Sequence, residues 1–175
     1  MLAFAQWLQS TTASTTIQSI NWLIPLLQSI HILMIGVVFV SILMIALRVL
    51  GRVRADESFS EVRDRFAPWM WSALGVMLVT GALLVVGEPV REFMSLSFWL
   101  KMALLAIGVL AAGVFSRLVW PTPFQDSHGP EFSAAARCTA IATVMLWLAI
   151  IFLGRAIAYD VAIWGSLSPA AVAGT

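Results

Sequence analysis

The chain has 175 residues, of which 61% are apolar and 11% are charged, and its mean hydropathy is +0.94. Soluble domains usually carry about 25% charged residues, so this composition excludes a water-soluble globular protein and indicates a membrane protein. The net charge of +1, without a basic and aromatic stripe, argues against nucleic-acid binding, and the single cysteine excludes an intramolecular disulfide.

The N-terminal segment is predicted to lie on the membrane rather than to be cleaved as a signal peptide. Residues 1–47 contain no Lys or Arg, whereas a signal peptide begins with a basic region. Residues 1–9 are apolar and aromatic, which favours a short interfacial helix. Residues 10–16 (STTASTT) are predicted to be a polar linker whose hydroxyl groups can cap the next helix.

Four apolar stretches are each long enough to cross a hydrocarbon core roughly 30 Å thick, which takes about 20 helical residues. They predict helices that begin at residue 17 or 22 and end at 50, and that cover 68–86, 98–120 and 133–159. Pro25 and Pro68 fall near helix starts, where proline is tolerated in the first turn. Short connections then predict an all-α antiparallel bundle of four transmembrane helices over residues 17–160, with the interfacial helix and linker before it. Residues 161–175 are expected to form a flexible or interfacial tail.

The connections differ in character. Residues 51–67 form the most charged segment, in which both signs alternate closely, and this favours a solvated helix or hairpin with local ion pairs. Residues 87–97 are predicted to be a loop with a turn at Gly87–Pro89. Residues 120–132 are rich in proline and cannot be helical throughout.

Basic residues are distributed unevenly between the two sides of this predicted bundle. One side carries seven of them: Arg48, Arg52, Arg54, Arg63, Arg65, Arg117 and Arg137. The other side carries three: Arg91, Lys101 and Arg155. Because cytoplasmic loops are enriched in Lys and Arg, both termini are expected to face the periplasm or the cell exterior.

Small residues predict where the helices approach one another, since membrane helices pack closely through such residues. The candidates are Gly75, Gly81, Gly108, Ala112 and Gly113. The methionines, in contrast, are scattered without an MxxM or MxM pair, so gap-filling in the core is the favoured interpretation and a methionine copper relay is not indicated.

His31 is the main candidate for a functional residue, because polar groups inside a bilayer are costly. It lies in the outer half or near the middle of the first span, one helical turn after Gln28 on the same face. Two interpretations stay open: a neutral histidine hydrogen-bonded to a neighbouring helix, or a ligand of a metal ion or a haem. His128, in the proline-rich connection, is too distant to share a ligand set and is expected to be exposed.

The remaining polar residues of the outer side allow a more specific hypothesis. Glu88 could pair with Lys101 or Arg155 around the mouth of an outward-facing cavity, with His31 below it. The alternative is that Lys101 and Arg155 extend separately to the lipid headgroups.

The order of four segments resembles small uncharacterised bacterial inner-membrane proteins related to the copper-resistance protein D domain. These segments are SIHILMIGVVFVSILMIALRVLG, PWMWSALGVMLVTGALLVVGEP, SFWLKMALLAIGVLAAGVFSR and LGRAIAY, within about residues 20–160. The resemblance implies a role in copper movement across the inner membrane. It also implies importance for six residues: His31, Arg48, Thr80, Gly81, Lys101 and Arg155. Some relatives carry a second His or an Asn where this chain has Ser116 and Arg117, which argues against a two-ligand site within one chain.

Three functions are therefore compared. The first is a non-enzymatic membrane protein that handles copper, haem or another small solute at an outward-facing cavity around His31 and the polar cluster of Gln28, Thr80, Glu88, Lys101 and Arg155. The second is an accessory or structural subunit of a larger membrane complex or a homo-oligomer. The third is a haem b electron carrier, in which His31 would need a second ligand from Met, water or another subunit. An enzyme is less favoured, since no Ser-His-Asp set, carboxylate pair or phosphate loop is evident.

Overall fold

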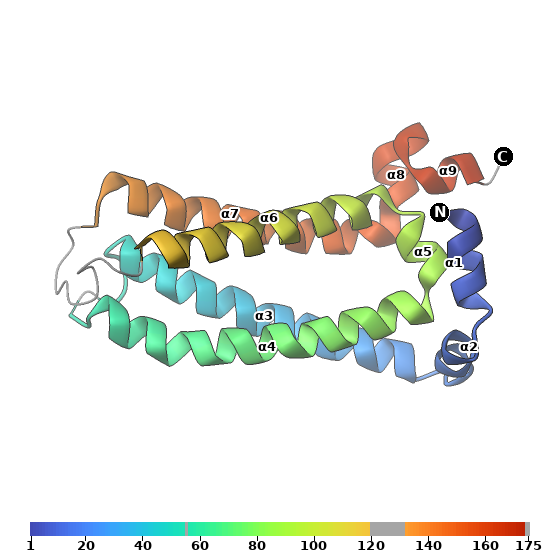
Figure 1. The fold of residues 1–175 in the computed structure, drawn as a ribbon, viewed down its shortest axis with the longest axis horizontal. Helices are drawn as coiled ribbons and strands as arrows, with labels where there is room; N and C mark the ends of the chain where they lie inside the picture. The colour runs from blue at the N-terminus through green and yellow to red at the C-terminus, as the bar shows by residue number, and fades with distance from the viewer. Residues whose placement is uncertain (55, 120–131, 174–175) are drawn as a thin grey trace.

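The structure is a computed structural model that describes residues 1–54, 56–119 and 132–173. These residues are almost entirely helical, and no strand occurs among them. Four long helices lie side by side, and short helices gather with both termini at one end (Figure 1). We call this end the terminal end, and the opposite end, which carries the connection between the first two long helices, the turn end.

The long helices are α3 (Leu23–Val49), α4 (Phe59–Gly87), α6 (Leu96–Val119) and α7 (Ala134–Ala156). The short elements are α1 (Leu2–Gln9), α2 (Thr12–Ser19), α5 (Pro89–Phe93), η2 (Ile157–Tyr159), α8 (Asp160–Trp164), η3 (Gly165–Leu167) and α9 (Pro169–Ala173). A helix, α1, is present where the interfacial helix is predicted, and its place at a membrane surface stays a prediction. The predicted linker over residues 10–16 is wrong, because most of it is the helix α2, which Thr11 caps by accepting a hydrogen bond from the Ser14 amide.

Three segments are long and apolar enough to cross a membrane: α3, α4 and the stretch Ala134–Leu167 that begins with α7. In α6 the described apolar segment, Leu96–Leu110, is shorter. Large apolar side chains point away from the bundle, as Ile32 at 65% and Leu78 at 75% exposure illustrate. In water such a surface would be strongly unfavourable, so the chain is compatible with a multi-pass membrane protein.

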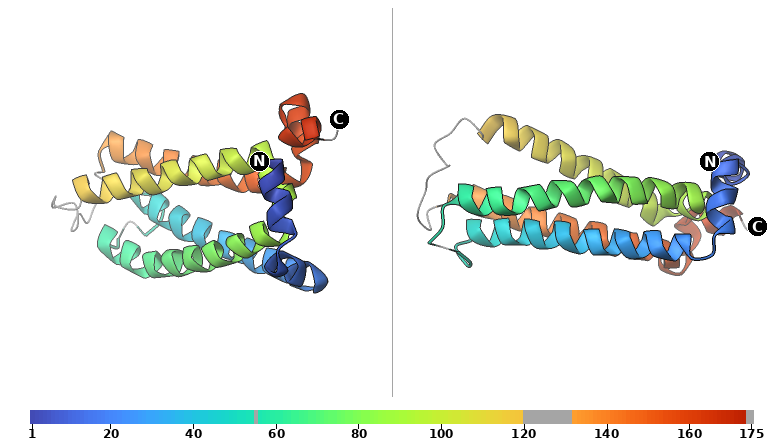
Figure 2. Two further views of the ribbon diagram at one scale, coloured as in Figure 1. Left: turned by 45° about the vertical axis from the view of Figure 1, so that its right-hand side comes forward. Right: turned by 90° about the horizontal axis from the view of Figure 1, so that it is seen from below.

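Helix α3 is the centre of the packing, because it contacts both α4 and α7, while α6 packs on α7. Along the described residues, α4 and α6 are not closely packed, and Figure 2 shows the two helices diverging. The core consists of Val38, Ile42 and Ala73, which are buried between α3 and α4. Met34 and Met77 pack against this core, in agreement with their predicted role as gap-filling side chains.

The turn between α3 and α4 explains the largest error in the predicted boundaries. Helix α3 ends in a Schellman motif: Gly51 has φ 68°, its amide donates to the Arg48 carbonyl, and the Arg52 amide donates to the Leu47 carbonyl. Helix α4 then begins at Phe59, nine residues before the predicted start, because Ser58 and Glu61 form a capping box. Pro68 therefore lies inside α4, and its prediction as a first-turn proline is wrong.

The other predicted boundaries hold more closely. Helix α3 begins after Trp22, the later of the two predicted starts, and Pro25 lies in its first turn. The predicted loop over residues 87–97 breaks the helix at Glu88 but contains the short helix α5. The tail is folded into short helical turns as far as Ala173, whereas its place at a membrane surface stays a prediction. The proline-rich connection, including His128, lies outside the described residues.

Two of the predicted glycine contacts are confirmed and one is wrong. A Cβ atom on Gly81 would lie 3.3 Å from Cε1 of His31 on α3, and one on Gly108 would lie 3.1 Å from Cδ2 of Leu146 on α7. Both glycines therefore face neighbouring helices. Gly75 meets no atom within 4 Å and does not serve a helix contact. The side chains at Ala112 and position 113 fall outside the described part of α6.

Candidate functional site

His31 and Thr80 meet at the interface of α3 and α4. Nδ1 of His31 lies 2.8 Å from Oγ1 of Thr80, and the Thr80 side chain is only 5% exposed. The expectation that His31 faces another helix rather than lipid is confirmed. The physical reason is that an imidazole without a hydrogen-bond partner in an apolar medium would lose roughly 1–3 kcal/mol.

The Thr80 hydroxyl determines which nitrogen of His31 carries the proton. Oγ1 of Thr80 donates to the carbonyl oxygen of Val76, 2.9 Å away and one turn earlier on α4. A hydroxyl has a single proton to donate, so with that proton on the Val76 carbonyl it accepts from His31, in the tautomer that is protonated at Nδ1. In that tautomer Nε2 keeps its lone pair. Gly81 leaves room for this ring, because any side chain there would press on Cε1.

A second polar group lies toward the terminal end. Nε2 of Gln28 is 3.5 Å from Oε2 of Glu88, and the same oxygen pairs with Nη1 of Arg91 at 2.7 Å. Gln28 and His31, one turn apart on α3, thus both find partners on the α4–α5 segment. The hypothesis that Glu88 pairs with Lys101 or Arg155 is wrong, because Arg91 on the neighbouring turn is its ion-pair partner.

Lys101 joins this region from α6. Its ammonium is close enough to His31 and to Glu92 to interact electrostatically with both. Its nitrogen also lies 5.9 Å from the centroid of the Phe98 ring, and its Cδ faces Gly154 on α7. Burial raises the pKa of Glu92, although Lys101 acts in the opposite direction. Charged groups from three elements therefore surround the terminal end of the His31 site.

Arg155 does not belong to this cluster. Its side chain is exposed, its guanidinium carbon lies 5.5 Å from the centroid of the Tyr159 ring, and Nη2 is 3.5 Å from the Tyr159 hydroxyl. Of the predicted cluster, the structure pairs His31 with Thr80 and Gln28 with Glu88, and it places the Lys101 ammonium close enough to His31 to interact electrostatically.

Asp160 is an important polar residue to which the sequence assigns no role. It is 6% exposed, and it caps the first turn of α6. Oδ1 accepts from the Ser95 hydroxyl (2.9 Å) and from the Ser97 amide (2.8 Å) and hydroxyl (2.6 Å), and Oδ2 accepts from the Leu96 amide (3.0 Å) and the Ser168 hydroxyl (2.6 Å). A carboxylate is favourable at a helix N-terminus. The serines before the apolar run of α6 are the only sequence signal for this arrangement.

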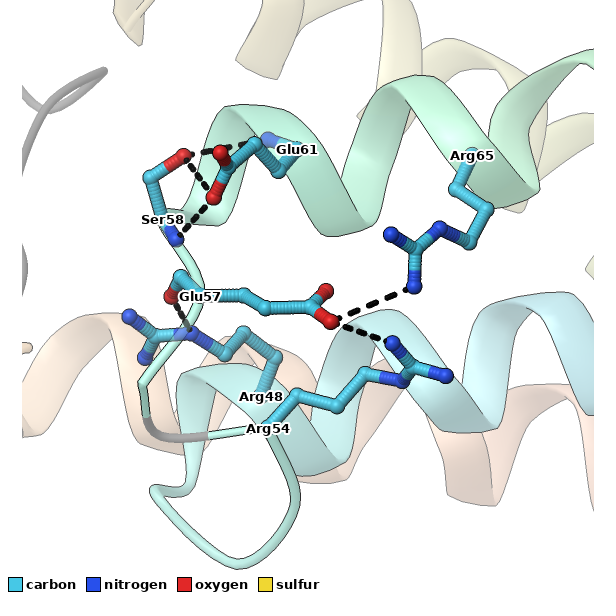
Figure 3. Close-up of polar contacts among 6 residues, drawn as sticks. All are labelled: Arg48, Arg54, Glu57, Ser58, Glu61 and Arg65. Atoms are coloured by element: carbon cyan, nitrogen blue, oxygen red, sulfur yellow. Dashed lines mark hydrogen bonds and ion pairs between the residues drawn. The ribbon is translucent and has the colours of Figure 1, made fainter.

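A second cluster, at the turn end, is drawn in Figure 3. Arg48 is fully buried, its Nε donates to the carbonyl oxygen of Glu57 at 2.7 Å, and its guanidinium lies 5.6 Å from the Phe132 ring centroid. The Glu57 carboxylate in turn pairs with Arg54 and Arg65. These contacts connect the end of α3 to the turn and to the residues before α7, so Arg48 has a structural role. The predicted local ion pairs of residues 51–67 are confirmed.

Conventional metal ligands do not form a cluster. Among the residues that the structure describes, no group of three His, Cys, Asp or Glu side chains is arranged to hold a metal ion. Any ion at this site would therefore depend on His31 together with ligands of another kind.

Comparison with known proteins identifies a family. No curated protein and no solved structure matches the chain. One family profile, described as a family of unknown function (DUF6644), matches residues 17–160. The match includes all four long helices together with His31, Thr80, Glu88 and Asp160. Because it covers most of the chain, this protein belongs to the DUF6644 family.

Proposed function

We propose that this chain is a non-enzymatic integral membrane protein with four transmembrane helices that binds copper through His31. The observation that carries the proposal is the hydrogen-bond sequence from His31 Nδ1 to Thr80 and on to Val76, which leaves Nε2 as a lone-pair donor. Metal-binding histidines are commonly oriented in this way, with the second ring nitrogen held by an outer partner.

The residues next to His31 favour Cu(I). Met34 and Met77 lie one helical turn from His31 and Thr80, on the same faces of α3 and α4 and toward the core. Thioethers and imidazole are soft or intermediate ligands that suit Cu(I), whereas the hard carboxylates lie toward the terminal end. In this proposal Met34 or Met77, which also fills space beside the core, supplies the sulfur ligand that completes the set begun by His31. The resemblance to the copper-resistance protein D domain agrees with this choice.

The distribution of charge supports access from the terminal end. Arg48, Arg52, Arg54, Arg63 and Arg65 lie at the turn end, and the positive-inside rule places that end in the cytoplasm of a bacterial inner membrane. The His31 site would then open to the periplasm past Gln28, Glu88 and Lys101. Helices α4 and α7 both run from the turn end to the terminal end. Helix α6 connects them by running back to the turn end, and it therefore serves as the fourth span in this arrangement.

The test is a Cu(I) titration of purified protein under anaerobic, reducing conditions against a chromophoric chelator of known affinity. Wild-type protein should withdraw Cu(I) from the chelator, and His31→Leu should lose this ability. Thr80→Val should bind roughly 10-fold to 100-fold more weakly, which is the usual effect of removing the outer partner of a metal-bound histidine. Thr80→Ser, which keeps the hydroxyl, should restore the affinity.

The matched control is His128→Ala, which removes the other histidine and should bind Cu(I) like wild type. Equal affinity of His31→Leu and wild type would contradict the proposal. An absorption band of haem in the purified protein would instead assign Nε2 of His31 to a haem iron. Metal-free, colourless protein that co-purifies with other subunits would favour the accessory-subunit function.

A further inference from the structure

A shallow depression lies near the terminal end, where α7 is followed by η2 and α8. It has a volume of about 330 Å³ and is bounded by Phe152 and Arg155 from α7, Tyr159 from η2, and Ile163 and Trp164 from α8. Most of its surface is apolar, and Phe152 is 73% exposed. The depression therefore continues the apolar surface of a candidate membrane span up to the point where the chain turns away from it.

Arg155 supplies the one positive charge of the depression. Its guanidinium carbon lies over the Tyr159 ring, 5.5 Å from the centroid, and Nη2 lies 3.5 Å from the Tyr159 hydroxyl. Within the described residues, no carboxylate forms an ion pair with Arg155. The nearest acid in sequence, Asp160, is turned inward and occupied by the donors of α6. The protein itself thus provides no counter-charge at this position.

The wall formed by α8 is fixed in place by hydrogen bonds to α6. Asp160 caps the first turn of α6, and Nε1 of Trp164 donates to Oγ of Ser97 at 2.9 Å. The two elements that border the depression, α7 and α8, are therefore held against a common helix. Because the walls of the depression are already held in place, ligand binding does not have to immobilise them. The entropy cost of binding is therefore smaller, which favours affinity.

We infer that this depression binds a phospholipid, with the phosphodiester on Arg155 and the Tyr159 hydroxyl and an acyl chain along Phe152 and Ile163. Arginine recognises phosphate oxygens through its planar set of donors. The cation lies in the last turn of α7, toward the end of the candidate span, where lipid headgroups would meet the protein and the apolar walls would face the acyl region. The inference does not depend on copper binding at His31.

The experiment measures retention of phosphatidylglycerol by the full-length protein in detergent, using native mass spectrometry over a range of lipid concentrations. Wild type should hold a tightly bound lipid, and Arg155→Gln should hold it about tenfold more weakly, as expected for loss of a charge-assisted hydrogen bond. Tyr159→Phe should have a smaller effect. The matched control is Arg52→Gln, which removes an exposed arginine at the turn end and should leave the tightest binding unchanged.

Three outcomes would overturn the inference. The first is equal lipid retention by wild type and Arg155→Gln with unchanged thermal unfolding. The second is binding of inorganic phosphate alone as tightly as phosphatidylglycerol, which would show that the apolar walls contribute nothing. The third is a dimer that excludes lipid and dissociates in Arg155→Gln, which would assign the depression to a second copy of the chain.

Discussion

A threonine inside a helix that packs against another helix can serve two hydrogen bonds at once. Thr80 donates to the Val76 carbonyl on its own helix and accepts from His31 on α3. The first bond uses a carbonyl that already belongs to the helix, so Thr80 needs no further partner in the apolar surroundings. The second bond orients the imidazole ring between α3 and α4.

Because burying an unpaired imidazole is costly, the sequence predicts that His31 faces another helix. Residue spacing does not predict which residue is its hydrogen-bond partner. Only the family resemblance points to Thr80, because the rotation of α4 about its axis cannot be read from a uniformly apolar sequence. Asp160 is a similar case. Its donors at Ser95, Leu96 and Ser97 lie more than sixty residues away in the chain, and sequence spacing carries no information on such a distant pairing.

Arg48 carries the first prediction. Arg48→Met keeps the length of the side chain but removes the bond to the Glu57 carbonyl and the contact of the cation with Phe132. Together these interactions are worth about 2–4 kcal/mol, so the midpoint of thermal unfolding in detergent should fall clearly. Arg52→Met, at an exposed arginine just past the end of the same helix, should leave the midpoint unchanged. Equal midpoints for Arg48→Met and wild type would show that the turn end is held together by other contacts.

At the scale of elements, glycines control how closely the long helices approach. Gly81→Leu would force a side chain against the His31 ring, and Gly108→Leu would collide with Leu146. Both variants should lower the unfolding midpoint, Gly81→Leu more strongly because it also disturbs the bond between His31 and Thr80. Gly75→Leu is the matched control: its Cβ meets nothing, and leucine favours helices by nearly 1 kcal/mol over glycine. A larger loss of stability in Gly75→Leu than in Gly81→Leu would contradict this packing.

Asp160 determines whether the C-terminal turns stay docked. Asp160→Asn replaces an oxygen acceptor with an amide that donates, opposite the donors of Ser97, Leu96 and Ser168. The loss of about 2 kcal/mol expected for unsatisfied buried groups should release α8 and α9. Hydrogen–deuterium exchange should therefore rise over residues 160–173 while α3 stays protected. Asp64→Asn, at an exposed position in α4, is the control, and unchanged exchange in Asp160→Asn would refute the cap.

The lengths of the elements show which sequence signals are strong. Apolar stretches located α3, the second half of α4, and α7, since burial in lipid requires them to be continuous. The first nine residues of α4 were missed because they are polar, although Ser58 and Glu61 have the spacing of a capping box. The same applies to α2, a polar helix for which Thr11 provides the cap. Short polar helices are stabilised by caps and neighbours, and hydropathy does not detect either.

For the whole molecule, the charge distribution predicts the orientation in the membrane, and cysteine labelling in a Cys138→Ser background tests it. Asp56→Cys at the turn end should react only after the cytoplasm is opened, and Ser166→Cys at the terminal end should react in intact cells. Both positions are exposed, whereas Ser58 and Ser168 are buried and would disturb their own hydrogen bonds. If Asp56→Cys reacts in intact cells, the predicted orientation is wrong, and the His31 site faces the cytoplasmic side instead.

In the whole molecule, His31, Gln28 and Glu88 lie toward the terminal end, whereas most of the arginines lie at the turn end. Copper K-edge X-ray absorption of the Cu(I)-loaded protein tests this account most directly, because it identifies the ligands of the bound ion. If His31 binds copper, the wild-type spectrum should contain imidazole scattering together with sulfur scattering, and His31→Leu should lose the imidazole contribution. A spectrum that is the same in wild type and His31→Leu would contradict the assignment of His31 as the copper ligand.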